Sequence, residues 1–347
     1  MSELNNQSFS VEDISIHEEE EEEEEADDID LPVDISKQIA LPTLSFSAEE
    51  AIAILLLRWT AQFKDFTVLR TDDPEVYVEC GIRINLGEEY NHEEKTYINS
   101  KNLKIDDYPS SMTVAGLIFY HYGEEAIINH LETMNLTCPE GDRPFLLKRL
   151  YTAIIEPLDL SLDNLSIYSD VRKLAQIMDP IDDHDPIVKQ ENFESLIDII
   201  IEQFDQRISW AAKKLLPGRN TIRKAIEDRK KILPSGDIVV IPHYVPLTMN
   251  KDLIEKKSQK KHGIKYIAMP RAVGDGGVYA LRWNSNFRKL KFNGFRDEHL
   301  TGMLQNFNGT GWIHPNGLVG AMDKLPNAVE YLKQILKDNK AGIASNF

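Results

Sequence analysis

Residues 82–101 read I-R-I-N-L-G-E-E-Y-N-H-E-E-K-T-Y-I-N-S-K, and this stretch decides the fold. Ile82 to Leu86 has the alternation of a strand that ends at Gly87, and Lys95 to Tyr97 predicts a second short strand before a polar end. In an open α/β sheet, ligands and metals bind at the carboxyl ends of the strands. We therefore expect a functional site where these two strands end.

Strands and helices alternate around this stretch. Ser47-Ala48-Glu49-Glu50 is a capping box, and it predicts the start of a buried helix over Ala48 to Phe63. Phe66 to Arg70 predicts a strand, and Thr113 to Tyr122 and Pro144 to Leu158 predict further helices. Alternating strands and helices indicate an α/β fold with a mainly parallel sheet, which we place in residues 39–165.

The second half of the chain has a different pattern. Residues 166–233 predict a helical bridge that breaks at Pro217-Gly218. Residues 234–347 predict a smaller α+β domain, because short strands alternate there with turn residues. Its expected elements are a strand at Asp237 to Pro242, a hairpin of Ile264 to Met269 with Val278 to Trp283, a strand at Gly311 to His314, a glycine-bearing loop and a closing helix over Pro326 to Lys337.

The net charge of −18 is unevenly distributed. Residues 1–36 hold fifteen Asp and Glu and no Lys or Arg, so the remainder carries only −3. We expect residues 1–38 to be a disordered acidic tail, since they offer little apolar surface to bury. The run Glu18 to Glu25 is either a solubilising tail or an acidic arm that docks on a basic partner protein or on a basic groove of its own chain.

The composition also narrows the compartment. The longest apolar run, Ala51 to Leu57, is far too short to span a bilayer, so no membrane association is expected. The polar, acidic N-terminus resembles neither a secretory signal nor a transit peptide. Two cysteines, Cys80 and Cys138, do not make a disulfide framework. We therefore predict a cytoplasmic or nuclear protein.

Several ordered motifs resemble one family, the Myg (melanocyte-proliferating-gene) exonucleases, a branch of the DHH phosphoesterases. Gly87, Tyr90 and Tyr97 match its Val-Asp-Val-Gly-Gly-x-Tyr-Asp and Tyr-Asp-His-His-Gln motifs. Residues 216–219 (L-P-G-R) and 234–239 (P-S-G-D-I-V) match its central motifs. Residues 292–300 (F-N-G-F-R-D-E-H-L) and 312–321 (W-I-H-P-N-G-L-V-G-A) match its C-terminal ones. The resemblance covers about residues 41–336 and implies a DHH-type domain with a smaller C-terminal domain.

The same resemblance implies a metal-dependent nuclease that acts 3′ to 5′ on RNA with two divalent cations, Mn²⁺ or Mg²⁺. Such hard cations need several carboxylates and imidazoles. Most of the family's ligand positions are changed here, so we expect no metal and no catalytic residue. The degenerate positions are Pro42, Ser47, Glu49, Asn85, Ile98, Asn99, Ser100 and Asp163.

Binding could persist without catalysis. Glycine loops let a phosphate approach main-chain N–H groups, although Gly317 and Gly320 could equally serve a tight turn. Basic segments could contact phosphate backbones, although charge runs on helices are usually solvated. The candidates for nucleic-acid contact are Arg219, Lys256, Lys257, Lys260, Lys261, Arg296, His314, Asn316, Gly317 and Gly320.

Three functional hypotheses follow. The first is a catalytically silent family member that binds RNA or a ribonucleoprotein such as the ribosome. The second is an active metal-dependent RNA exonuclease whose ligands come from other residues, for which His92, His121 and His314 are available. The third is a protein-interaction scaffold that uses the acidic tail. The acidic cluster Asp179, Asp182, Asp183, His184 and Asp185 predicts a solvated loop rather than a metal site.

Overall fold

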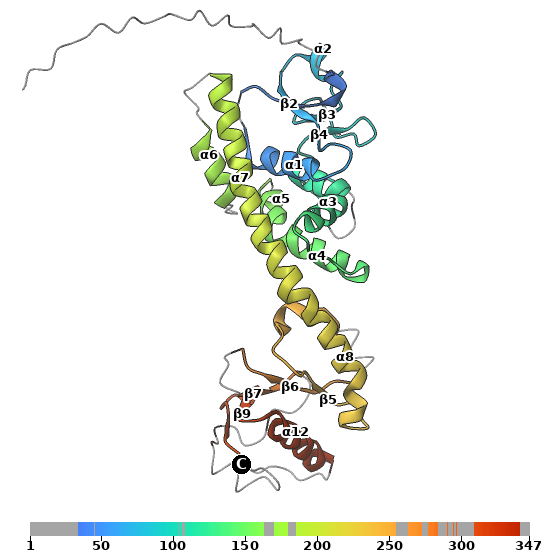
Figure 1. The fold of residues 1–347 in the computed structure, drawn as a ribbon, viewed down its shortest axis with the longest axis vertical. Helices are drawn as coiled ribbons and strands as arrows, with labels where there is room; N and C mark the ends of the chain where they lie inside the picture. Colours follow the sequence, from blue (N-terminus) through green and yellow to red (C-terminus); the bar gives the residue numbers. More distant parts are fainter. Residues whose placement is uncertain are drawn as a thin grey trace, which may run out of the picture.

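The structure is a computed structural model of the 347-residue chain. It describes residues 34–44, 46–103, 105, 108–162, 170–179, 185–254, 263–272, 277–283, 290, 294, 296 and 309–340. Two lobes are joined by one long helical rod, as Figure 1 shows. The predicted acidic tail, apart from its last residues, lies outside the described ranges.

The N-terminal lobe contains a four-stranded, fully parallel sheet in the order β2-β1-β3-β4. Its strands are β1 (Gln38–Leu41), β2 (Thr67–Arg70), β3 (Ile82–Ile84) and β4 (Thr96–Tyr97). The two strands predicted in the deciding stretch are therefore confirmed, as is the parallel α/β class. Because β1, β3 and β4 run in one direction, the residues that follow them meet at one edge of the sheet.

Helices cover this sheet and build the larger core. Ten of the eleven residues of α1 (Ala48–Arg58) are buried, and α3 (Val114–Thr133) packs against it. The other helices of the lobe are α2 (Pro74–Tyr77), α4 (Arg143–Leu150), a π turn at Tyr151–Ile155, α5 (Glu156–Ser161) and α6 (Asp170–Met178).

The rod consists of α7 (Pro186–Trp210), a π turn at Ala211–Leu215 and α8 (Leu216–Ile232). The predicted break at Pro217-Gly218 is wrong. Pro217 lies in the first turn after the π turn, where the helix widens locally and where proline's missing N–H is tolerated. Apolar residues of α7 belong to the core of the N-terminal lobe, whereas Ile222 and Ile226 of α8 belong to a core of the C-terminal lobe. The predicted bridge therefore packs into both lobes.

The C-terminal lobe holds a five-stranded mixed sheet in the order β5-β6-β7-β9-β8. Its strands are β5 (Ile238–Val240), β6 (Tyr266–Pro270), β7 (Val278–Arg282), β8 (Gly311–Ile313) and β9 (Val319–Met322). The predicted hairpin of β6 with β7 is confirmed. Strand β9 was expected to be loop, and that expectation is wrong: Gly320 lies within the strand, where a β-carbon would meet Ile313 of β8 at 2.4 Å.

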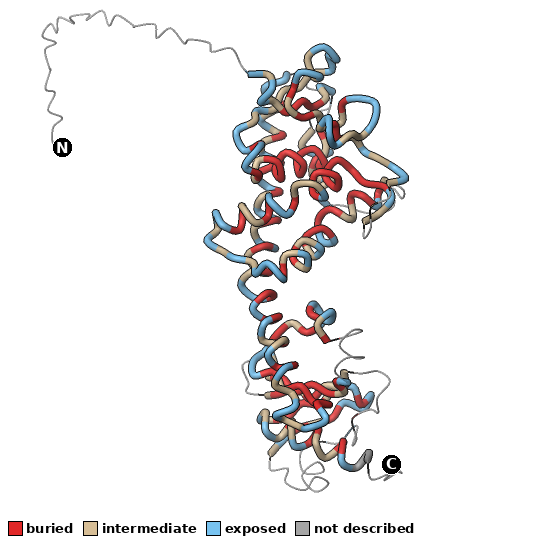
Figure 2. The backbone as a smooth tube through the Cα atoms, turned by 90° about the vertical axis from the view of Figure 1, so that its right-hand side faces the viewer, coloured by how far each residue is buried: buried red, intermediate tan, exposed pale blue. Residues whose placement is uncertain are grey.

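Alternate residues of this sheet face two different helices. Ile238, Tyr266 and Ala268 pack with α12 (Leu325–Lys340), whereas Val239 and Ile267 pack with α8. Two short helical turns, Leu247–Asn250 and α9 (Lys251–Ile254), return the chain towards the N-terminal lobe. Figure 2 shows the buried backbone gathered in the two lobes along the rod. No helix in the described ranges is long and apolar enough to cross a membrane.

Candidate functional site

A cleft of about 440 Å³ lies where β1, β3 and β4 end. Its walls come from the N-terminus of α1, the residues after β3 and β4, and α6. Four predicted positions meet there: Ser47, Glu49, Asn85 and Asn99. The structure thus brings together residues that are up to 52 positions apart in sequence, as expected for the carboxyl edge of a parallel sheet. The remaining lining residues are Phe46, Ala48, Glu50, Arg172, Ala175, Gln176 and Asp179.

Glu50 is a site residue that sequence reasoning treated only as a helix cap. The capping box is confirmed: Glu50 N–H donates to Ser47 Oγ at 3.2 Å, and Ser47 N–H donates to Glu50 Oε2 at 3.1 Å. The other carboxylate oxygen, Oε1, accepts from Asn85 Nδ2 at 2.7 Å. Burial raises the pKa of Glu50 above its ordinary value. The capping role hid this second contact, which depends on a residue from another strand.

Asn85 follows β3 in the left-handed region, with φ 55°, a conformation that asparagine tolerates better than most residues. Its N–H donates to the Tyr97 carbonyl at 2.8 Å, which fixes it beside β4. Its amide donates to Glu50. An aspartate at this position would set two carboxylates side by side, and such a pair needs a shared proton or a cation. The asparagine removes that requirement.

Glu49 is paired with an arginine from another element. It is 6% exposed, and Arg172 of α6 donates to its Oε1. Arg172 also donates to Ser161 Oγ at the end of α5. A guanidinium is permanently charged at any physiological pH. The carboxylate that the resemblance matches to a metal ligand is therefore paired with a cation that belongs to the protein itself, the Arg172 guanidinium.

The other degenerate positions support the backbone. Asn99 Oδ1 accepts from Val114 N–H at 3.0 Å and so caps α3. Ser100 exchanges two backbone hydrogen bonds with Met112, each 2.9 Å long. The Pro42 carbonyl accepts from Arg70 Nη1 at 3.0 Å. Ile98 is half-buried, and Asp163 lies outside the described residues.

Asp159 is fully buried against the N-terminus of α3. It accepts three hydrogen bonds, from Thr113 N–H (2.8 Å), Thr113 Oγ1 (2.6 Å) and Tyr151 Oη (2.7 Å). Burial raises its pKa to about 6 despite these bonds. A β-carbon at Gly116 would meet the Asp159 carboxylate at 2.4 Å, so the glycine makes room for this contact. Asp159 therefore holds α3 in place.

The donor set of the cleft does not fit a pair of divalent cations. Glu49 is neutralised by Arg172, and Glu50 is engaged by an amide and by its own helix cap. Among the described lining residues, Asp179 is the one further carboxylate, and a single free carboxylate is too little for two cations. Two hard cations beside a phosphate need several free anionic oxygens. Within the described ranges, no three side chains of histidine, cysteine, aspartate and glutamate are grouped so that they could hold a metal ion.

The histidines considered as substitute ligands have other partners. His92 and His121 stack with ring centroids 3.6 Å apart and an interplanar angle of 5°. His92 Nδ1 lies 2.7 Å from Tyr97 Oη, and His121 Nε2 lies 2.5 Å from Tyr90 Oη. Burial, together with His92, lowers the pKa of His121 to about 4. These stacked rings belong to an aromatic cluster and do not line the cleft.

The predicted acidic loop is only partly described. Asp179 forms the bend that follows α6, as the predicted loop requires, and it also lines the cleft. Asp185 caps α7 through the Ile187 N–H at 2.8 Å. Asp182, Asp183 and His184 lie outside the described residues.

The C-terminal glycine loop is a tight turn between β8 and β9. Gly317 N–H donates to the His314 carbonyl at 2.8 Å, and its φ of 65° suits glycine. Asn316 N–H donates to His314 Nδ1 (3.2 Å), and Leu318 N–H donates to Asn316 Oδ1 (2.9 Å). Three successive N–H groups are thus engaged within the turn. The alternative of a tight turn therefore holds for Gly317, whereas Gly320 packs closely within β9, and a phosphate contact at these glycines stays a prediction.

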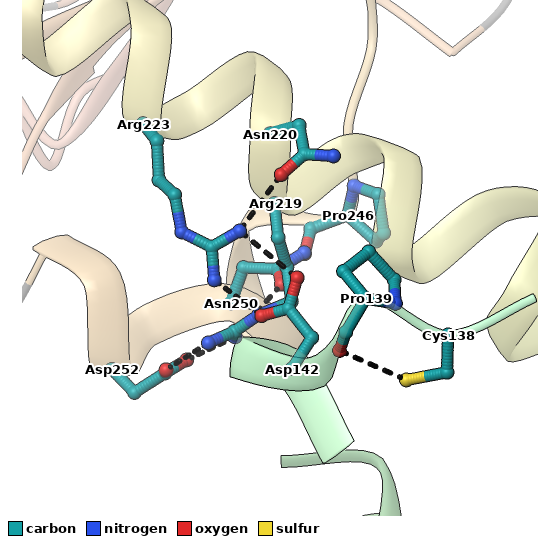
Figure 3. A network of polar contacts seen from close by, with 9 residues as sticks. All are labelled: Cys138, Pro139, Asp142, Arg219, Asn220, Arg223, Pro246, Asn250 and Asp252. Atoms are coloured by element: carbon teal, nitrogen blue, oxygen red, sulfur yellow. Dashed lines mark hydrogen bonds and ion pairs between the residues drawn. The ribbon is translucent and has the colours of Figure 1, made fainter. Parts of the chain in front are cut away.

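Arg219 was a candidate for nucleic-acid contact, and its burial contradicts that role. It is 4% exposed, and its guanidinium stacks on Phe145 with the Cζ atom 3.6 Å from the ring centroid. Figure 3 shows it between two carboxylates from different lobes. Its Nε donates to Asp142 at 2.7 Å, and its terminal nitrogens donate to Asp252 at 2.9 and 2.8 Å. A phosphate cannot replace these partners without opening the junction between the lobes.

The remaining candidates fall into two groups. Lys256, Lys257, Lys260 and Lys261 lie outside the described residues. Arg296 is exposed and pairs with Trp312 of β8 in an antiparallel bridge, and His314 is exposed two residues further on. Directly paired residues and residues two apart share one face of a sheet. Arg296, Trp312 and His314 therefore lie on a common face.

Comparison with known proteins identifies the family to which the chain belongs. Residues 39–336 match a family model, MYG1_exonuc, described as "Uncharacterised protein family (UPF0160)". The chain belongs to the MYG1 family. It is 26% identical over 299 residues to "MYG1 protein" of Dictyostelium discoideum, covering 80% of this chain and 89% of that protein.

Two further relatives of this MYG1-family chain carry different names. It is 24% identical over 332 residues to "MYG1 protein YER156C" of Saccharomyces cerevisiae, covering 87% and 96% of the two chains. It is 25% identical over 228 residues to "MYG1 exonuclease" of Homo sapiens, covering 59% and 60%. The resemblance in the sequence is thus confirmed, and the family includes proteins named exonucleases.

Proposed function

We propose that this MYG1-family chain is catalytically silent and acts by binding RNA, free or in a ribonucleoprotein, in the cytosol or nucleus. The observation that supports the absence of catalysis is the ion pair between Arg172 and Glu49. A tethered guanidinium there competes with a divalent cation for the same carboxylate. It can balance charge, but it cannot hold and activate a water molecule as a metal does.

The C-terminal sheet supports the proposal of RNA binding. A pocket of about 430 Å³ is lined by three aromatic side chains, Tyr244, Tyr279 and Trp312, together with Val245, Leu247, Thr248, Met269, Leu281 and Val319. Tyr244 is 47% exposed. Arg271 lies over the Tyr279 ring, 5.8 Å from its centroid. Aromatic faces beside cationic groups are the usual means of binding single-stranded nucleic acid.

The test measures cleavage and binding on the same samples. Purified protein is incubated with Mn²⁺ and a 3′-labelled single-stranded RNA, with and without EDTA, and run on denaturing and native gels. We expect a shifted complex and intact RNA. Cleavage that EDTA abolishes would establish the nuclease alternative. The absence of both cleavage and a shifted complex would refute RNA binding.

Matched variants locate the surface. Trp312→Ala should weaken the shift roughly tenfold or more, because stacking of a base on an aromatic ring is worth about 1 to 3 kcal/mol. Arg296→Ala should weaken it as well and reduce its salt dependence, because a phosphate contact is lost. Lys337→Ala, at an exposed position on α12, is the control and should leave the shift unchanged.

A further inference from the structure

A second groove, distinct from the cleft, has an apolar floor and a basic rim. Its larger part, about 470 Å³, lies between α4, the π turn after it and the end of α7; α4 and α7 can be followed in Figure 1. Leu146 and Leu150 of α4 and Ala211 and Leu215 of the rod form a buried floor. An adjoining pocket of about 320 Å³ extends it towards α9 and shares Arg149, Thr152 and Met249.

The rim carries four cations. Arg149 and Arg207 line the larger part, and Arg149, Lys148 and Lys251 line the extension. Within the described residues, none of the four forms an ion pair, whereas the one carboxylate of the rim, Asp252, is held by Arg219. The rim is therefore uncompensated positive charge in a folded part whose overall charge is close to zero.

Two large apolar side chains are exposed at the same place. Trp210 is 42% exposed and Met249 is 38% exposed, and both line the groove. Unpaired cations around exposed apolar side chains fit a ligand that carries apolar groups flanked by negative charges. The uncompensated rim excludes a basic ligand.

We propose that this groove binds the chain's own acidic N-terminal segment, residues 1–33. That segment holds fourteen Asp and Glu and no Lys or Arg. Its apolar residues Phe9, Val11, Ile14 and Ile16 directly precede the run Glu18 to Glu25. The apolar residues match the floor, and the glutamates match the rim.

Tethering makes the contact feasible. A lobe of this size is on the order of 40 Å across, whereas the 18-residue step from Ile16 to Asp34 can span roughly 60 Å when extended. The segment joins the lobe at Asp34, and α4 and α7 of that lobe form the groove walls. A tethered ligand acts at an effective concentration of up to about millimolar, so even weak docking is populated. The inference does not depend on RNA binding.

The test places a reporter on the segment in the full-length chain. Ser15→Cys is labelled with bimane, whose emission is quenched by contact with tryptophan, in a chain carrying Cys138→Ala. Cys80 is buried and is left in place. We expect quenched emission that recovers in Trp210→Phe and in about 1 M NaCl, where surface charges are screened within about 3 Å.

Charge variants decide whether the groove is the site. Arg149→Glu with Arg207→Glu should weaken docking roughly tenfold or more, since each attraction at the rim becomes a repulsion. Lys213→Glu with Lys214→Glu is the matched control, because both lysines are exposed on the same rod outside the groove. An unchanged melting temperature in both pairs shows that the fold is intact.

Three results would overturn the proposal. Unquenched bimane in the parent chain would mean that the segment does not reach Trp210. Quenching that survives Arg149→Glu with Arg207→Glu would mean that the basic rim does not hold it. Unquenched bimane together with RNA binding that this double variant abolishes would assign the groove to nucleic acid instead.

Discussion

Arg172 and Glu49 lie 123 residues apart in the sequence and form an ion pair inside the cleft at the edge of the parallel sheet. Glu49 is nearly buried, with 8% of its side chain exposed, against 28% for Arg172. The negative charge of the Glu49 carboxylate is therefore balanced by the Arg172 guanidinium. This charge balance gives the first prediction.

Arg172→Gln should lower the free energy of unfolding at pH 7 by about 2 to 3 kcal/mol, because it leaves a buried carboxylate without its cation. Chemical denaturation measures the loss. The control is the double variant Glu49→Gln with Arg172→Gln, which should recover most of it, since neither charge remains. Equal losses in the single and double variants would show that the ion pair has no special role.

Asp159→Asn should change how stability depends on pH. The folded-state pKa of Asp159 is raised to about 6, so the folded chain binds its proton more tightly than the unfolded chain. Its contribution to stability is present at low pH and is lost as pH rises from about 4 to about 6. The parent should therefore lose up to about 3 kcal/mol relative to Asp159→Asn over that interval.

Urea unfolding at pH 4 and pH 7 measures this difference. Asp159→Ala is the contrasting variant, because it leaves the Thr113 and Tyr151 donors without an acceptor. It should therefore be less stable than the parent at both pH values. A parent-to-Asn difference that does not vary with pH would contradict the raised pKa.

His121→Gln should make the chain less sensitive to acid. The folded-state pKa of His121 is lowered to about 4. Between pH 6.5 and pH 4 its imidazole is therefore protonated in the unfolded chain and neutral in the folded chain. Its contribution to stability is present above pH 6.5 and is lost as pH falls towards 4. Because the ring is half-buried, the effect should be on the order of 1 kcal/mol.

The melting temperature of parent and variant between pH 7 and pH 4 tests this assignment. His243→Gln, at an exposed position, serves as the control. We expect the parent and the control to lose stability in parallel below pH 6.5, and His121→Gln to lose less. Parallel curves for all three proteins would refute it.

Arg219→Gln should loosen the junction between the lobes. Burial alone would raise the pKa of Asp142, but hydrogen bonds from Arg223 and Arg219 hold it below its ordinary value. Removing one arginine leaves this fully buried carboxylate undercompensated and releases Asp252, which should cost about 3 to 5 kcal/mol. Unfolding should then separate into two steps, one for each lobe.

Calorimetry detects the second step. Lys224→Gln removes an exposed charge from the same helix and should leave a single transition. A single, little-shifted transition for Arg219→Gln, accompanied by weaker RNA binding, would restore Arg219 as a nucleic-acid contact.

Part of the site could be predicted because it depends on local order. The resemblance to the family's short motifs singled out Ser47, Glu49, Asn85 and Asn99, and the strand ends and the capping box, which depend on residues within a few positions, indicated where they lie in the fold. Glu50 was missed as a site residue because its second partner, Asn85, is 35 positions away. Arg172 was missed because no spacing rule links α6 to α1.

Two errors in the predicted fold come from local composition. Pro217 and Gly218 have the composition of a helix break, yet the π turn before them lets the rod continue. Gly320 has the composition of a loop, yet its missing side chain lets β9 lie close to β8. At Gly320, packing against a neighbouring strand outweighed local preference, whereas at Pro217 a local widening of the helix removed the conflict.

The sequence by itself determined the family and the parallel sheet, because alternation, caps and motif residues act over short distances, and it predicted that most of the family's metal ligands are replaced. Only the tertiary structure decided which charges meet. It paired Arg172 with Glu49, enclosed Arg219 between Asp142 and Asp252, and left Arg149 and Arg207 beside an apolar floor. Charge pairing depends on distance and burial in space, and neither can be read from order along the chain.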